Sequence, residues 1–103
     1  LKLAFMIDAK DFIKDDEVDY ALIDDVIHDS EDSPFDICRL AIKYSELDHS
    51  VKIGDYVKTK GYDLIINLII VIRKVFFHFY AFTFATTLNI FKNAKVTFIL
   101  SEH

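Results

Sequence analysis

The stretch "KGYDLIINLI", residues 60–69, decides the fold, because a glycine and an aspartate in it lead directly into an apolar run. That run covers residues 64–72, and Asn67 is its only polar residue. A membrane-spanning helix needs about 20 apolar residues, whereas this run has nine positions and ends at the basic pair 73–74. Isoleucine and valine fill its second half, which favours a strand. We therefore predict a strand over 63–72, covered on both faces as in a parallel sheet, and no membrane association.

The composition around this run indicates a single folded α/β domain over residues 1–103, with the possibility that it is part of a longer protein. Apolar residues make up 52% of the 103 residues, and there are only two glycines and one proline. This excludes a disordered chain and a loop-rich disulfide scaffold. Cys38 is the single cysteine, so no intramolecular disulfide can form, and we expect a reducing, cytoplasmic setting.

Charge is distributed unevenly along the chain. Residues 1–36 hold twelve acidic and three basic side chains, whereas residues 37–103 hold five acidic and nine basic ones. Such a separation favours head-to-tail association, or a basic protein partner for the acidic segment 15–32. It argues against nucleic acid as a partner of that segment, because phosphates would be repelled.

The remaining segments give further expected elements from their hydrophobic periodicity. The apolar opening predicts a buried strand over 1–8. Helical spacing predicts helices over 16–29 and over 33–47, the second with Ser33 as its cap and Pro34 at its first position. Alternation predicts a half-exposed strand over 51–57, and a last strand is expected over 95–101. Residues 75–93 fit either a helix or a hairpin.

This alternation of elements predicts an open, mostly parallel Rossmann-like sheet of about four strands, with helices on both faces. The aromatic residues of the segment 76–84 would lie on every side of a helix, which indicates burial against a second copy. We therefore expect self-association, and hence an oligomer, through Phe76, Phe77, Phe79, Phe82 and Phe84.

Four stretches carry a resemblance to a known family: "LKLAFMI", "LAIKYSELDHSVKI", "KGYDLIINL" and "NAKVTFILSEH". Together they resemble the N-terminal half of glycosyltransferases that are built from two Rossmann-like domains. The resemblance rests on strand edges, such as Tyr62-Asp63 before the third strand and His103 after the fourth. It implies a transferase that binds an acceptor or a nucleotide-sugar at the carboxyl ends of its strands. The glycine-poor first loop and the long acidic insert depart from the family pattern, and no cofactor is indicated for this chain.

Polar residues expected at the carboxyl edge of the sheet are the candidates for chemistry, because ligands of open α/β sheets bind there. Glu102 and His103 could act as acid and base on a bound hydroxyl, with Asp8 nearby as a third catalytic candidate. The residues predicted at this edge are Asp8, Asp55, Ser101, Glu102 and His103.

Two other functions remain open. A metal-dependent nuclease would hold Mg²⁺ through Asp8 together with Asp63 or Glu102. Asp63 precedes its strand, however, which places it at the opposite edge from Asp8 and weakens that set. The second alternative is a non-catalytic interaction domain that dimerises through its aromatic C-terminal region. No phosphate-binding loop or zinc-ligand spacing is present in the sequence, and Cys38 is expected in the core.

Overall fold

The computed structural model describes residues 2–72, 85–91 and 94–102 of the chain. Four strands form the main sheet: β1 (Ala4–Asp8), β4 (Ile37–Lys43), β5 (Asp63–Ile72) and β6 (Lys95–Glu102). Two short strands form a hairpin, β2 (Ile13–Lys14) and β3 (Glu17–Val18). The helices are α1 (Tyr20–Val26), α2 (Leu47–Thr59) and residues 85–90. Three 3₁₀ turns complete the fold: η1 (Ala9–Phe12), η2 (Ser30–Asp32) and η3 (Tyr44–Glu46).

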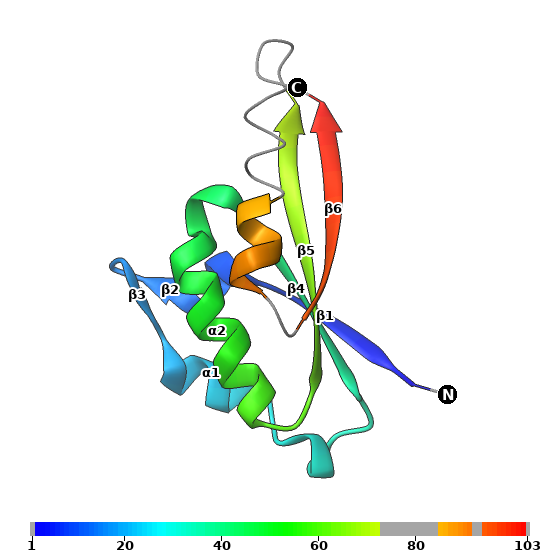
Figure 1. The fold of residues 1–103 in the computed structure, drawn as a ribbon. Helices are drawn as coiled ribbons and strands as arrows, with labels where there is room; N and C mark the ends of the chain where they lie inside the picture. The colour runs from blue at the N-terminus through cyan, green and yellow to red at the C-terminus, as the bar shows by residue number, and fades with distance from the viewer. Residues whose placement is uncertain (1, 73–84, 92–93, 103) are drawn as a thin grey trace.

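The predicted α/β domain with an open, parallel, four-stranded sheet is confirmed. The strand order is β1-β4-β5-β6, and each neighbouring pair is parallel (Figure 1). The strand predicted over 63–72 is β5, and it lies inside the sheet between β4 and β6. The strands predicted at the two ends of the chain are present as β1 and β6.

One face of the sheet carries the hydrophobic core. Because side chains alternate along a strand, Cys38, Leu40 and Ile42 of β4 share a face, and all three are buried. Their register partners on β5 are Leu64, Ile66 and Leu68, which are buried as well. This row of apolar side chains packs against Ile23 of α1, Ile53 and Val57 of α2, and Phe91.

The described helices all cover this same face, whereas helices on both faces were expected. Leu40, Leu64 and Phe91 all lie close to Gly54 of α2, and α1 contacts α2 through Tyr20 and Tyr56. Figure 1 shows α1, α2 and residues 85–90 on one side of the sheet. The reason lies in the strand order, which proceeds in one direction without reversal. Right-handed crossovers between successively added parallel strands all fall on one side.

The prediction of a helix over 33–47 was wrong, because its centre forms strand β4. The capping signal at Ser33 has a local role instead, since its hydroxyl accepts a hydrogen bond from the Phe35 N–H at 3.1 Å. Within 37–43, the exposed Arg39 and Lys43 alternate with buried apolar residues. A period of two is typical of a strand, and this pattern outweighs the helix-capping signal at Ser33.

The prediction of a strand over 51–57 was also wrong, because this segment belongs to helix α2. A segment of seven residues is too short to distinguish the two-residue period of a strand from the 3.6-residue period of a helix. Over the full helix the buried residues are Leu47, Ser50, Ile53, Gly54 and Val57, at spacings of three and four. This is the stripe of an amphipathic helix.

The helix predicted over 16–29 is shorter than expected. Asp19 caps α1, and its carboxylate accepts a hydrogen bond from the Leu22 N–H at 3.1 Å. The preceding residues form the β2–β3 hairpin, whose two-residue turn is Asp15-Asp16 with φ of 52° and 62°. A tight hairpin turn needs positive φ at both central residues, and aspartate tolerates it.

Part of the expected organisation lies outside the described residues. This holds for Phe76, Phe77, Phe79, Phe82 and Phe84, and for most of the 75–93 segment, of which 85–90 are helical. Among the residues that the structure describes, no helix has the length and apolar character needed to cross a bilayer.

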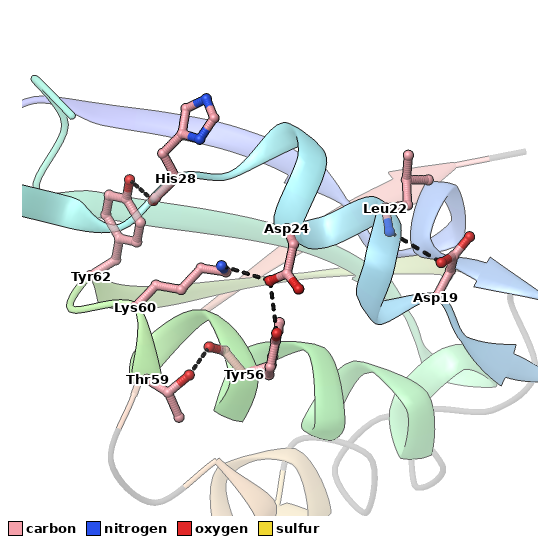
Figure 2. Close-up of polar contacts among 8 residues, drawn as sticks. All are labelled: Asp19, Leu22, Asp24, His28, Tyr56, Thr59, Lys60 and Tyr62. Atoms are coloured by element: carbon pink, nitrogen blue, oxygen red, sulfur yellow. Dashed lines mark hydrogen bonds and ion pairs between the residues drawn. The ribbon is translucent and has the colours of Figure 1, made fainter. Parts of the chain in front are cut away.

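A polar cluster fastens α1 to α2 and to the turn that leads into β5. Figure 2 shows Asp24 of α1 accepting hydrogen bonds from the Lys60 ammonium at 2.8 Å and from the Tyr56 hydroxyl at 2.7 Å. Beside it, the Tyr62 hydroxyl donates to the His28 carbonyl at 2.6 Å. The hydrogen bond from Lys60, followed by that from Tyr56, lowers the pKa of the Asp24 carboxyl below its ordinary value of 3.8. The same carboxylate raises the pKa of the Lys60 ammonium and of the Tyr56 hydroxyl.

We expect Asp24→Asn to reduce the free energy of unfolding in a pH-dependent manner. A carboxyl whose pKa is lowered by folding adds stability that is complete above its unfolded pKa and is lost as pH falls through its folded pKa. The difference in free energy of unfolding between wild type and Asp24→Asn should therefore be constant above pH 3.8 and shrink as the pH falls below that value. At alkaline pH the difference should shrink a second time, because Lys60 and Tyr56 lose their protons. Urea unfolding at a series of pH values from acid to alkaline measures this difference.

The matched control for this prediction is Asp25→Asn. Asp25 is the next acid on the same helix, it is exposed, and it has no ion pair within the described part of the chain. A pH profile of Asp25→Asn that matches that of Asp24→Asn would show that total charge, not the cluster, is responsible.

Candidate functional site

The carboxyl edge of the sheet holds a polar pocket of about 330 Å³. Strand β1 ends at Asp8 and β4 ends at Lys43, so the turns η1 and η3 that follow them meet at this edge. The pocket is lined by Lys10 of η1, Ile13 and Asp16 of the hairpin, Ser45 and Glu46 of η3, and His49 of α2. Its size lies within the range of small-molecule sites.

His49 and Asp16 both line this pocket and contact each other. The Nε2 atom of His49 lies 2.9 Å from Oδ1 of Asp16, 33 residues away in the chain. The Asp16 side chain is 97% exposed, whereas that of His49 is only 23% exposed. Asp16 lies in the positive-φ turn of the β2–β3 hairpin, and this turn places its carboxylate beside His49 of α2.

His49 keeps one nitrogen without a partner. Its Nδ1 atom is buried and has no hydrogen bond within the described residues. When Nε2–H donates to Asp16, Nδ1 is the acceptor nitrogen of the neutral ring. Because Nδ1 is buried, it is not open to a ligand in the pocket; the group of this pair that is open there is the exposed Asp16 carboxylate.

The charges around the pocket favour a neutral, hydrogen-bonding ligand. The lining carries two carboxylates, Asp16 and Glu46, and one ammonium, that of Lys10, which pairs with Asp8 at 3.9 Å. Glu46 also accepts a hydrogen bond from the Lys43 N–H at 3.0 Å, which fixes it at the end of β4. An anion would meet two like charges here, whereas hydroxyl groups can donate to both carboxylates.

Asp8 has a local structural role at this edge. Its carboxylate accepts a hydrogen bond from the Lys10 N–H at 3.3 Å and so caps η1. Asp8 and Asp11 together line a second pocket, of about 520 Å³, beside the edge strand β1. Glu102 is the last residue of β6, at the expected edge, while the side chain of Glu102 and the whole of His103 lie outside what the structure describes.

The structure corrects the placement of Asp55. This residue was expected at the carboxyl edge, but it is exposed within α2 because the segment around it is a helix. Asp63 is the first residue of β5, at the amino edge, where it pairs with Lys2 at 3.3 Å. Asp8 and Asp63 therefore cannot share a metal ion, and no cluster of metal-ligating side chains exists among the described residues.

Cys38 is buried in the core as expected, although it lies on β4 and not on a helix. Burial raises the pKa of its thiol to about 12. The thiolate is the reactive form of cysteine, so Cys38 is no nucleophile at neutral pH.

An apolar pocket of about 270 Å³ lies at the opposite end of β1, between α1 and the chain that enters β4. Its walls include Phe5, Phe35 and Tyr62, whose rings meet edge to face with Phe5 in the middle, at centroid distances of 5.4 and 5.2 Å. These rings pack the amino edge of the sheet. The groups able to do acid–base chemistry are concentrated at the carboxyl edge instead.

Asp16 and His49 were missed by sequence reasoning. Nothing in the sequence links two residues 33 positions apart, and His49 shares no ligand spacing with other histidines. The one available signal was the pair Asp15-Asp16 between Lys14 and Glu17, which is typical of a tight hairpin turn.

Comparison with protein-family models finds no match, and comparison with curated proteins and with solved structures finds no significantly similar chain.

Proposed function

We propose that this chain binds a small polyhydroxylated molecule at the carboxyl edge of its sheet, as the acceptor-binding half of a glycosyltransferase-like enzyme. The observation that carries the proposal is the convergence of Lys10, Asp16, Glu46 and His49 in one pocket at the carboxyl ends of the strands. The pocket lies at the carboxyl ends of the strands, which is the edge where open α/β sheets bind ligands, although this strand order has no switch point. A cytoplasmic setting, in which Cys38 stays a thiol, is part of this proposal.

Asp16 and His49 have the roles of binding and orientation in this proposal. The exposed carboxylate of Asp16 accepts a hydrogen bond from a ligand hydroxyl, and the imidazole ring of His49 holds that carboxylate in place. Glu102 and His103 remain proposed as further acid–base groups at the same edge.

The test is an NMR titration of the ¹⁵N-labelled chain with a methyl glucoside, which is neutral, and with glucose 1-phosphate, which is anionic. We expect shifts at residues 10, 16, 45, 46 and 49 for the neutral sugar and weaker binding of the anion. His49→Gln removes the group that holds the Asp16 carboxylate, and binding should weaken by up to about tenfold, which corresponds to one hydrogen bond of about 1–1.5 kcal/mol.

The matched control is His28→Gln, which changes an exposed histidine at the other end of β1 and leaves the backbone carbonyl that Tyr62 contacts. Sugar binding should be unchanged in this variant. No shifts with either sugar, or equal loss in both variants, would contradict the proposed site.

A further inference from the structure

Strand β1 is an edge of the sheet, and its outer side has no pairing strand among the described residues. The Leu3 carbonyl accepts a hydrogen bond from the Ile37 N–H at the start of β4, at 3.1 Å. Because the backbone groups of successive residues in a strand point to opposite sides, those of Ala4 and Met6 point away from β4. Residues 3–7 contain neither a charged residue nor a proline, which are the usual protections of an edge strand. The outer edge of β1 is therefore able to pair with a further strand.

Two pockets lie one after the other along this edge. The pocket of about 270 Å³ lies at the amino end of β1, and the pocket of about 520 Å³ lies at its carboxyl end. Ile7 of β1 and Val26 of α1 line both pockets, so the two adjoin. Side chains two residues apart on a strand point to the same face and lie about 7 Å from each other. Successive apolar side chains of an added strand can therefore enter the two pockets in turn.

Exposed apolar side chains mark the same place. Val26 is 56% exposed and Met6 is 54% exposed, and both line the larger pocket. Apolar side chains that gather on an exposed surface are typical of an interaction site. Apolar contact and backbone pairing are thus both available along β1.

The charges beside the two pockets have one sign. Apart from His28, the only titratable side chains lining them within the described part of the chain are carboxylates: Asp32 in the smaller pocket, Asp8 and Asp11 in the larger one. Asp8 pairs with Lys10 at 3.9 Å. Asp11 and Asp32 are exposed and form no ion pair with another described residue. Cationic side chains of a partner would be complementary to them.

From these observations we infer that β1 binds an extended segment of a basic partner protein as an additional strand. The backbone of the segment pairs with the outward groups of β1, and its alternate apolar side chains occupy the two pockets. Basic residues at the two ends of the segment lie beside Asp32 and Asp11. Val26 and Asp32 belong to the acidic segment 15–32, for which the sequence predicts a basic partner, so the inference gives that partner a place.

This interaction surface is separate from the proposed sugar site. The pocket that contains Asp16 and His49 shares no lining residue with the two pockets along β1. The inference therefore does not rest on the proposed function, and either can fail without the other.

The test is an NMR titration of the ¹⁵N-labelled chain with a capped peptide. The peptide has lysine at both ends and, between them, isoleucine or valine alternating with threonine. We expect shifts at residues 4–8, 26 and 32–35. A peptide of the same pattern with glutamate at both ends should bind at least about tenfold more weakly, because its carboxylates meet those of the chain.

Met6→Pro tests the backbone pairing. Proline removes the outward N–H of residue 6 and is tolerated where the N–H of an edge strand faces solvent. This variant should lose binding of the lysine peptide while its far-ultraviolet circular dichroism stays unchanged. If Met6→Pro fails to fold, Val26→Gln decides, because Val26 is exposed at the end of α1. The loss of its apolar contact should weaken binding about tenfold.

The charge is tested by Asp32→Asn, which should weaken binding of the lysine peptide by about two- to fivefold. Its control is Asp25→Asn, since Asp25 is an exposed acid of α1 that lines neither pocket, and binding should be unchanged there. Equal binding of the lysine and glutamate peptides, or full binding by a folded Met6→Pro or by Val26→Gln, would overturn the inference. So would outward β1 amides that are protected from hydrogen exchange without peptide, because a second copy then occupies the edge.

Discussion

Replacing Ile66 by alanine is expected to lower the free energy of unfolding by about 2–5 kcal/mol, a large part of the stability of a domain of this size. Ile66 is fully buried at the centre of β5, between Leu40 and Val96 in the register. The substitution removes three carbon atoms and leaves a cavity that rigid neighbouring strands cannot fill. Urea denaturation followed by circular dichroism measures the loss.

The control for this prediction is Ile90→Ala. Ile90 has the same side chain, but it is 38% exposed on the helical segment 85–90, so its loss should cost less than about 1 kcal/mol. Equal losses for Ile66→Ala and Ile90→Ala would contradict the placement of the core on the inner face of β5.

Replacing Gly54 by leucine is expected to destabilise the fold by about 1–3 kcal/mol or more, because the helix has no room for the side chain. A Cβ atom at Gly54 would already lie 2.9 Å from Leu64, with Phe91 and Leu40 at 3.8 and 3.9 Å. Leucine is a good helix former, so the loss would reflect packing between α2 and the sheet and not helix propensity.

Gly54→Ala is the companion variant that separates these two effects. Its Cβ needs only a small shift of the flexible Leu64 side chain, and alanine gains about 1 kcal/mol over glycine in a helix. Its stability should therefore stay close to that of wild type. If thermal unfolding finds Gly54→Leu as stable as Gly54→Ala, α2 cannot pack as closely on β5 as described.

The sequence predicted correctly the α/β class with an open, parallel, four-stranded sheet, and it located three of the four strands, β1, β5 and β6. Strand β5 was predicted with its observed bounds, because nine nearly continuous apolar positions flanked by charge leave few alternatives. The segment that forms β4 was predicted as a helix, and part of α2 was predicted as a strand; both errors have one physical reason. Short segments such as 37–43 and 51–57 satisfy both periods at once, and the neighbours in space then decide.

The site was predicted less well than the fold. Asp8 and Glu102 lie at the carboxyl ends of their strands as expected, since the strand direction determines their position; their role in chemistry stays a prediction. Asp55 was misplaced together with its element. The pairing of Asp16 with His49 depends on a hairpin that folds back over a helix end, and no local pattern encodes contact at that separation.

The strand order has a consequence for how this chain can be made. Each sheet strand after β1 pairs with the sheet strand synthesised before it, so a nascent chain leaving the ribosome can extend the sheet one crossover at a time. No strand has to be inserted between two that are already paired, as folds whose order reverses demand. Sequential addition of this kind shortens the loops to be closed, and every new strand is added at the same side of the sheet while β1 stays the other edge.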